Sequence, residues 1–233
     1  MDDQTIDEKK EIRLAVVYSA LLTLLPWLVQ LIGVVFSLQL KQFGLKPLEW
    51  KGLSGIFTMP LLHADWEHLI SNTPAMWLLI FGLFLFYKRD AWPILLCLCL
   101  LSGFLTWLMG RNSTHIGASG LVYALAAFHF LSGVIKKELR QRAFALLVAF
   151  FYGGFVWAFF PTLYRGTSIS WEGHLSGLIA GILFAFYFRD KGPAPPVYPF
   201  LEDEDGDAGD TEEVDRYWDH PEDTGSPGIN TEF

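Results

Sequence analysis

The chain of 233 residues alternates long apolar stretches with short polar segments. Six of the apolar stretches are 18 to 23 residues long, which is the length that an α-helix needs to cross a hydrocarbon core of ~30 Å. We expect transmembrane helices at Leu14–Phe36, His68–Tyr87, Trp92–Met109, Ile116–Ile135, Ala143–Pro161 and Ser170–Phe188. The pattern therefore predicts an all-α fold, a polytopic membrane protein built as a bundle of six transmembrane helices.

The segments around these helices divide the chain into three parts. Residues 1–13 are polar and are expected to form a cytoplasmic lead, residues 14–190 a single membrane domain, and residues 191–233 an acidic disordered tail. The loop Ser37–Pro60 mixes charged, aromatic and aliphatic residues, which is typical of a partly helical segment at the membrane interface. A composition of 52% hydrophobic residues is too apolar for an ordinary soluble domain.

The positions of the basic residues predict the orientation of the bundle. Six spans place both ends on one side, and with that side inside, the inner segments hold eleven Lys and Arg residues against five in the outer segments. This excess places both termini in the cytoplasm, so the second, fourth and sixth spans run inward. The basic cluster Lys136–Arg142 fits an anchor on anionic lipid rather than a nucleic-acid site.

Polar residues in the three inward-running spans fall at a similar depth. Asn72, Ser119 and His174 lie 14 to 16 residues from the inner ends of their spans, about 21–24 Å above the inner edge at ~1.5 Å per residue. His68 lies one turn before Asn72 on the same face. Because polar groups in a membrane are costly and usually face the bundle interior, we expect these four side chains to meet.

Small residues favour contact between the fourth and sixth spans. His174, Gly177 and Gly181 project from one side of the sixth span, and Gly120 lies beside Ser119 in the fourth. Such residues let two helices approach closely, which would bring His174 to Ser119. The same glycines beside Ser119 would also suit a plain helix contact without chemistry.

The predicted cluster has the parts of a serine nucleophile and its base. A neutral imidazole at His174 would take the proton of Ser119 and later return it to a leaving amine. His68 and Asn72 lie at the right depth to donate hydrogen bonds to an oxyanion, and Tyr123 lies one turn below Ser119, where it would stack on the histidine ring. No acidic residue is an obvious third member, so a dyad is predicted.

Three further polar residues have less specific interpretations. Glu172 is expected at the outer surface, and His115, in the loop before the serine, as a solvated residue or one that touches substrate. His129 lies ten residues past Ser119, too deep to share its chemistry, and is expected to form an interhelical hydrogen bond. Cys97 and Cys99 are too close for an ordinary disulfide or a complete zinc site. We therefore predict no cofactor and no metal.

Taken together, three motifs resemble the rhomboid intramembrane serine proteases. They are His63-x4-His68-x3-Asn72, Gly117-Ala118-Ser119-Gly120 with Tyr123, and Gly173-His174-Leu175-Ser176-Gly177 with Gly181. Their order and their placement on the second, fourth and sixth spans agree with that family over about Leu14 to Phe188. The basic six-span form is typical of bacterial members, which implies an integral protein of the bacterial inner membrane.

The resemblance also implies roles for individual residues. Ser119 corresponds to the nucleophile and His174 to its general base, while His68 and Asn72, with the Ser119 backbone N–H, correspond to the oxyanion hole. Tyr123 is similar to the tyrosine that packs on the catalytic histidine. The chain departs from many family members in the loop Ser37–Pro60, which lacks a Trp-Arg pair.

Two supporting positions complete the match, and they lead to a functional prediction. Gly117 corresponds to the first glycine of the serine motif and His63 to the outer histidine, with a supporting role. The resemblance implies an endopeptidase that cleaves transmembrane or juxtamembrane segments of membrane proteins through an acyl-enzyme. Its partners would be transmembrane substrates and membrane lipids, with no nucleic acid. The alternative is a non-catalytic scaffold that binds membrane proteins; a solute pathway is disfavoured because the polar residues cluster at one depth.

Overall fold

The computed structural model describes residues 3–152 and 170–193. Most of them are helical, with short loops between the helices. In chain order these are α1 (Asp3–Val35), η1 (Leu40–Phe43), η2 (Trp50–Gly52), α2 (Gly55–Thr58), η3 (Met59–Leu61), α3 (Trp66–Tyr87), η4 (Lys88–Asp90), α4 (Ala91–Met109), α5 (Ser119–Lys136), α6 (Leu139–Tyr152) and α7 (Trp171–Tyr187).

Three stretches of the described chain are long and apolar enough to cross a membrane. They are Glu8–Val35, Trp66–Met109 and Ser119–Lys136. The second stretch contains both α3 and α4, which η4 separates at Lys88, a residue with φ 48°. The chain is thus an integral membrane protein with an all-α polytopic fold, as predicted.

The observed helices follow the predicted spans closely, except that α1 and α6 begin earlier, α6 at Leu139 instead of Ala143. α1 begins at Asp3 rather than at Leu14, so the helix continues into the polar lead. The loop Ser37–Pro60 is partly helical, as predicted, and contains the short helices η1, η2 and α2. The part of the predicted fifth span after Tyr152, and the tail from residue 194 onward, lie outside the described residues.

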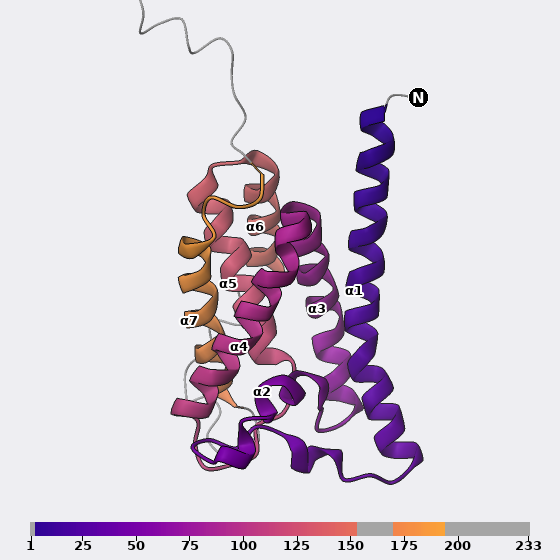
Figure 1. Cartoon of the computed structure of the whole chain (residues 1–233), viewed down its shortest axis with the longest axis vertical. Helices are drawn as coiled ribbons and strands as arrows, with labels where there is room; N and C mark the ends of the chain where they lie inside the picture. Colours follow the sequence, from indigo (N-terminus) through magenta and orange to yellow (C-terminus); the bar gives the residue numbers. More distant parts are fainter. Residues whose placement is uncertain (1–2, 153–169, 194–233) are drawn as a thin grey trace, which may run out of the picture. The chain divides into compact units, whose positions relative to one another are not determined.

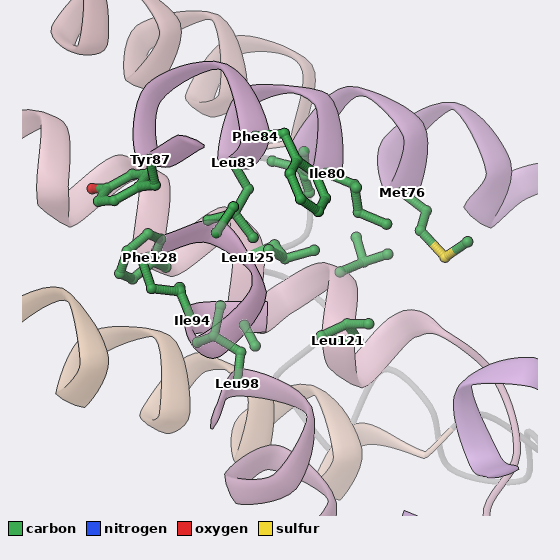
Figure 2. Packing of buried hydrophobic residues seen from close by; sticks show 14 of the residues in the cluster. Met76, Ile80, Leu83, Phe84, Tyr87, Ile94, Leu98, Leu121, Leu125 and Phe128 are labelled. Carbon is green, nitrogen blue, oxygen red and sulfur yellow. The ribbon is translucent and has the colours of Figure 1, made fainter. Parts of the chain in front are cut away.

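A core of apolar side chains joins α3, α4 and α5. Figure 2 shows them pointing toward one another between the three helices. The labelled members are Met76, Ile80, Leu83, Phe84, Tyr87, Ile94, Leu98, Leu121, Leu125 and Phe128. Large apolar residues on α1 are exposed instead, among them Leu21, Leu24 and Leu28. Such a surface suits hydrocarbon rather than water.

Helix α5 lies at the centre of the bundle and packs most extensively against α7, with α1 lying beside α3 (Figure 1). Glycines allow the α5–α7 contact. A Cβ atom at Gly177 would lie 2.1 Å from the carbonyl oxygen of Gly120, and one at Gly181 would lie 2.3 Å from that of Ala124. The backbones therefore approach too closely for any larger residue, as the spacing of small residues predicted.

Candidate active site

Ser119 is the first residue of α5 and follows a turn that requires glycine. Gly117 has φ +116°, and a Cβ there would lie 2.8 Å from Cε1 of His68. Its N–H donates to the carbonyl of Met59 at 2.9 Å, which fixes the turn to η3. Since only glycine adopts this conformation without strain, Gly117 determines how Ser119 enters the helix, with the free N–H groups of the first turn around it.

The α5–α7 contact places Ser119 and His174 at the same level of the bundle. A Cβ at Gly120 would lie 3.2 Å from the carbonyl oxygen of Gly173, so the backbones beside the serine and beside the histidine touch. On α7 the N-cap residue Ser170 accepts a hydrogen bond from the Gly173 N–H at 3.1 Å. Ser170 therefore caps the start of α7, which carries His174 and lies against the start of α5.

The ring of His174 lies flat on the ring of Tyr123. Their centroids are 4.3 Å apart and the ring planes differ by 15°. The exposed fractions are 6% for His174 and 5% for Tyr123, so the stack is buried, whereas Ser119 is half-buried. Because Ser119 and Tyr123 are four residues apart on one helix, they share a face, and the histidine ring lies against that face.

His63 and His68 lie on the other side of the turn that precedes Ser119. The two rings pack edge to face with centroids 5.2 Å apart. The backbone N–H of Ala118 donates to Nε2 of His63 at 3.4 Å. Asp65 caps α3 by accepting from the N–H of His68 at 2.8 Å. These contacts join the start of α3 to the start of α5.

Asn72 lies one turn further along α3 and is bonded within its own helix. Its Nδ2 donates to the carbonyl of His68 at 2.9 Å. A primary amide carries two N–H donors, so this bond uses one of them. Asn72 also lines a small void together with His63 and Ala118, which places the amide beside the turn that leads to Ser119.

His63, which lies outside the membrane-spanning helices, should make stability depend on pH. Burial, and secondarily the charge of His68, lowers the pKa of His63 from 6.5 to about 4. Because the pKa of His63 is lowered only in the folded protein, the unfolded chain binds the proton at a higher pH than the folded chain does. The free energy of unfolding therefore keeps its full value above pH 6.5 and decreases as the pH falls from 6.5 toward 4. We expect the free energy of unfolding, measured in detergent, to decrease by an amount on the order of 2–3 kcal/mol over this range.

The matched variant is His63→Gln, which keeps a hydrogen-bond acceptor for the Ala118 N–H without a titrating ring. Thermal unfolding of both proteins between pH 4 and 8 isolates the contribution of His63. The variant is expected to show a shallower fall in melting temperature below pH 6.5. Parallel curves for the two proteins would show that His63 does not titrate differently on unfolding.

Two predictions about polar residues near the site were wrong, and one was right. Glu172 and His115 are buried, with exposed fractions of 5% and 3%, and the two belong to one polar cluster with Ser170. The sequence predicted Glu172 at the outer surface, and His115 as a solvated residue or one that touches substrate. His129 forms the predicted interhelical hydrogen bond, with Nε2 2.9 Å from the carbonyl oxygen of Leu79. Among the described residues, no group of three or more His, Cys, Asp or Glu could hold a metal.

These observations define a polytopic helical membrane protein with a serine and a stacked histidine at one helix contact. A family model described as the Rhomboid domain matches residues 50–191. Uncharacterized proteins of Mycobacterium bovis and Mycobacterium tuberculosis are each 36% identical over 169 residues, which is 70% of this chain and 70% of each relative. An uncharacterized protein of Mycobacterium leprae is 33% identical over 70% of this chain and 66% of its own length. The chain belongs to the rhomboid family.

Proposed function

We propose that this protein is an intramembrane serine endopeptidase in which Ser119 is the nucleophile and His174 its general base. The observation that carries the proposal is the buried stack of His174 on Tyr123, on the helix face that begins with Ser119. An imidazole held flat beside a serine at a helix N-terminus is the arrangement that nucleophilic acyl transfer needs. Membership of the rhomboid family supports the same reaction class.

The proposed reaction proceeds through an acyl-enzyme. Ser119 Oγ attacks the carbonyl carbon of the scissile peptide while its proton moves to His174. The tetrahedral intermediate expels the amine, which takes that proton from the imidazolium and leaves an ester on Ser119. A water molecule, deprotonated by His174, then hydrolyses the ester and releases the acid.

The oxyanion of the intermediate would be held from two sides. The Ser119 N–H lies in the first turn of α5, where backbone donors have no partner within the helix. The ring of His68 lies against Gly117, and the Asn72 amide carries a second N–H beyond the one bonded to the His68 carbonyl. Donors fixed around a developing negative charge contribute much of the rate enhancement in acyl transfer.

The proposed orientation places this chemistry toward the outer side of the cell membrane. The excess of Lys and Arg in the inner segments supports cytoplasmic ends for the bundle. Ser119 would then lie near the outer end of α5, where water needed for deacylation is within reach. Transmembrane helices of other proteins are the proposed substrates, and lipids surround the apolar outer faces of the bundle.

A substrate helix should have to unwind before it is cut, because a helical carbonyl is already bonded and screened. Introducing Gly or Pro near the cleavage site of a poor transmembrane substrate is therefore expected to raise its cleavage rate, by about tenfold if unwinding costs ~1.4 kcal/mol per cut. Small side chains at the cut should be preferred. Rates that do not respond to helix-breaking residues would contradict this part of the proposal.

Tyr123 is expected to contribute through its ring rather than its hydroxyl. Tyr123→Phe keeps the stacked ring and should retain activity within about threefold, whereas Tyr123→Ala releases the imidazole and should lower kcat by about 10–100-fold. Steady-state cleavage together with melting temperature separates misplacement from unfolding. Equal losses in both variants would assign the effect to the hydroxyl.

Cleavage of a reporter with one unstable transmembrane helix, in liposomes, tests the proposed function. Mass spectrometry of the products should locate a single cut within or beside the helix. A protein that binds the reporter without cutting any of a panel of such helices would instead be the non-catalytic scaffold.

A further inference from the structure

A polar cluster, in which His115 and Glu172 are buried and Arg111 is exposed, lies on the far side of α7 from the His174 ring. Its members come from two segments: Arg111 and His115 from the loop before Ser119, and Ser170 and Glu172 from the start of α7. Arg111 Nε lies 3.5 Å from Glu172 Oε1, and His115 Nδ1 lies 2.7 Å from Ser170 Oγ. The cluster therefore joins the segment that leads into the serine to the helix turn that carries the histidine.

The hydrogen bonds of this cluster form a consistent set. Ser170 Oγ accepts from the Gly173 N–H and lies closer to His115 Nδ1 than to Glu172 Oε2, at 2.7 Å against 3.5 Å. With the hydroxyl donating to Nδ1, the ring carries its proton on Nε2, which lies 3.0 Å from the carbonyl oxygen of Arg111. This tautomer satisfies both neighbours.

Glu172 is costly to bury, and its position on α7 decides whether it can contact the His174 ring. A carboxylate with an exposed fraction of 5% needs a charged partner, which Arg111 supplies. Glu172 and His174 are two residues apart on a helix, so their side chains point to opposite sides. The carboxylate therefore cannot act as a third catalytic member on the imidazole, and its influence passes through the backbone of α7.

The loop side of the cluster is equally constrained. His115 pairs with Leu45 in an isolated β-bridge, with its N–H 2.8 Å from the Leu45 carbonyl oxygen and its own carbonyl 3.0 Å from the Leu45 N–H. Leu45 itself is fully buried. From His115 the chain reaches Gly117 and Ser119 within one short segment, so the position of His115 fixes where the serine turn begins.

We propose that Arg111 and Glu172, with His115 and Ser170 between them, are positioning residues that hold the start of α7 to the serine loop and so fix His174 relative to Ser119. This inference rests on the proposed function where it concerns catalysis. The four residues together, called the clamp below, also hold the two segments in place whether or not the protein is an enzyme. The α5–α7 glycine contact holds the two helices from one side, and this cluster holds their leading ends from the other.

The principal test is Glu172→Gln, which keeps the shape of the side chain and removes its charge. The matched control is Glu11→Gln, the same change in the exposed pair with Lys88, whose atoms are 2.6 Å apart. Three experiments are done in detergent: labelling of Ser119 by a fluorophosphonate, steady-state cleavage of the reporter (kcat and KM), and amide hydrogen exchange of residues 110–120 and 170–177.

The clamp predicts a specific pattern in these measurements. Glu172→Gln should lower the labelling rate and kcat by about tenfold, with KM within about twofold, because the geometry of the reacting groups changes and not substrate binding. Exchange should become faster in the two segments and nowhere else. Glu11→Gln should match the wild type in all three. Wild-type kcat, labelling and exchange in Glu172→Gln would overturn the inference.

A second pair of variants tests the positioning role of the cluster if Glu172→Gln does not fold. Arg111→Lys keeps a positive charge and should retain at least a third of the wild-type labelling rate, whereas Arg111→Gln should show the same losses expected for Glu172→Gln. Equal rates in these two variants would overturn the inference. If the wild type neither cuts nor labels, the proposed function fails, and the exchange of the two segments still tests the clamp.

Discussion

Ser119→Ala is expected to abolish cleavage, with a loss of at least about 10³-fold in kcat. Without the hydroxyl no acyl-enzyme forms, and the oxyanion donors have no tetrahedral intermediate to hold. The fold should survive the change, because Ser119 is half-buried at the start of α5 and no packing contact of the core depends on it. Melting temperature and reporter cleavage, measured on the same preparation, check both halves of this expectation.

His174→Ala is the companion variant, and the double variant makes the test specific. If the two residues act as a unit, removing both should cost no more than removing either alone. Additive losses would mean that the serine and the histidine act independently. Full activity in Ser119→Ala would point to another nucleophile.

Gly177→Ala is expected to damage both stability and activity, because it acts on the contact that aligns the two residues. The new methyl group would lie 2.1 Å from the carbonyl oxygen of Gly120, and ordinary contact begins at 3.4 Å. Backbone atoms cannot rotate away, so α5 and α7 must separate by about 1 Å. Overpacking of this kind costs roughly 1–3 kcal/mol, and a 1 Å misplacement costs about 10²-fold in rate.

The matched control for this change is Gly33→Ala in α1. There the nearest atom to the new methyl group is Cδ1 of Leu40 at 3.2 Å, the end of a flexible side chain. Alanine also favours the helix, so melting temperature and kcat should stay close to those of the wild type. Similar behaviour of Gly33→Ala and Gly177→Ala would contradict the role assigned to the α5–α7 contact.

The sequence was sufficient to predict the helices and the contact between the two helices that carry Ser119 and His174, for physical reasons. Long uncharged stretches can satisfy their backbone only as helices in a membrane, so their ends were found to within a few residues for α3, α4, α5 and α7. The small residues on the fourth and sixth spans predicted the α5–α7 contact, and the stack of Tyr123 on His174 follows from that contact.

The polar cluster beyond His174 could not be predicted in the same way. Polar residues in short loops near a membrane surface are ordinary, so nothing in the pattern distinguished the buried Glu172 and His115 from solvated residues. His115 pairs with Leu45, on a loop that folds back onto the segment before Ser119. Such tertiary pairing leaves no periodic signal in a single sequence.

Covalent labelling tests whether His174 activates Ser119. The wild type, His174→Ala and Ser119→Ala are each treated with a fluorophosphonate, and the modified residue is located by mass spectrometry. We expect an adduct on Ser119 in the wild type, labelling at least about 10²-fold slower in His174→Ala, and none in Ser119→Ala. An adduct on another residue, or equal labelling of Ser119 with and without His174, would contradict it.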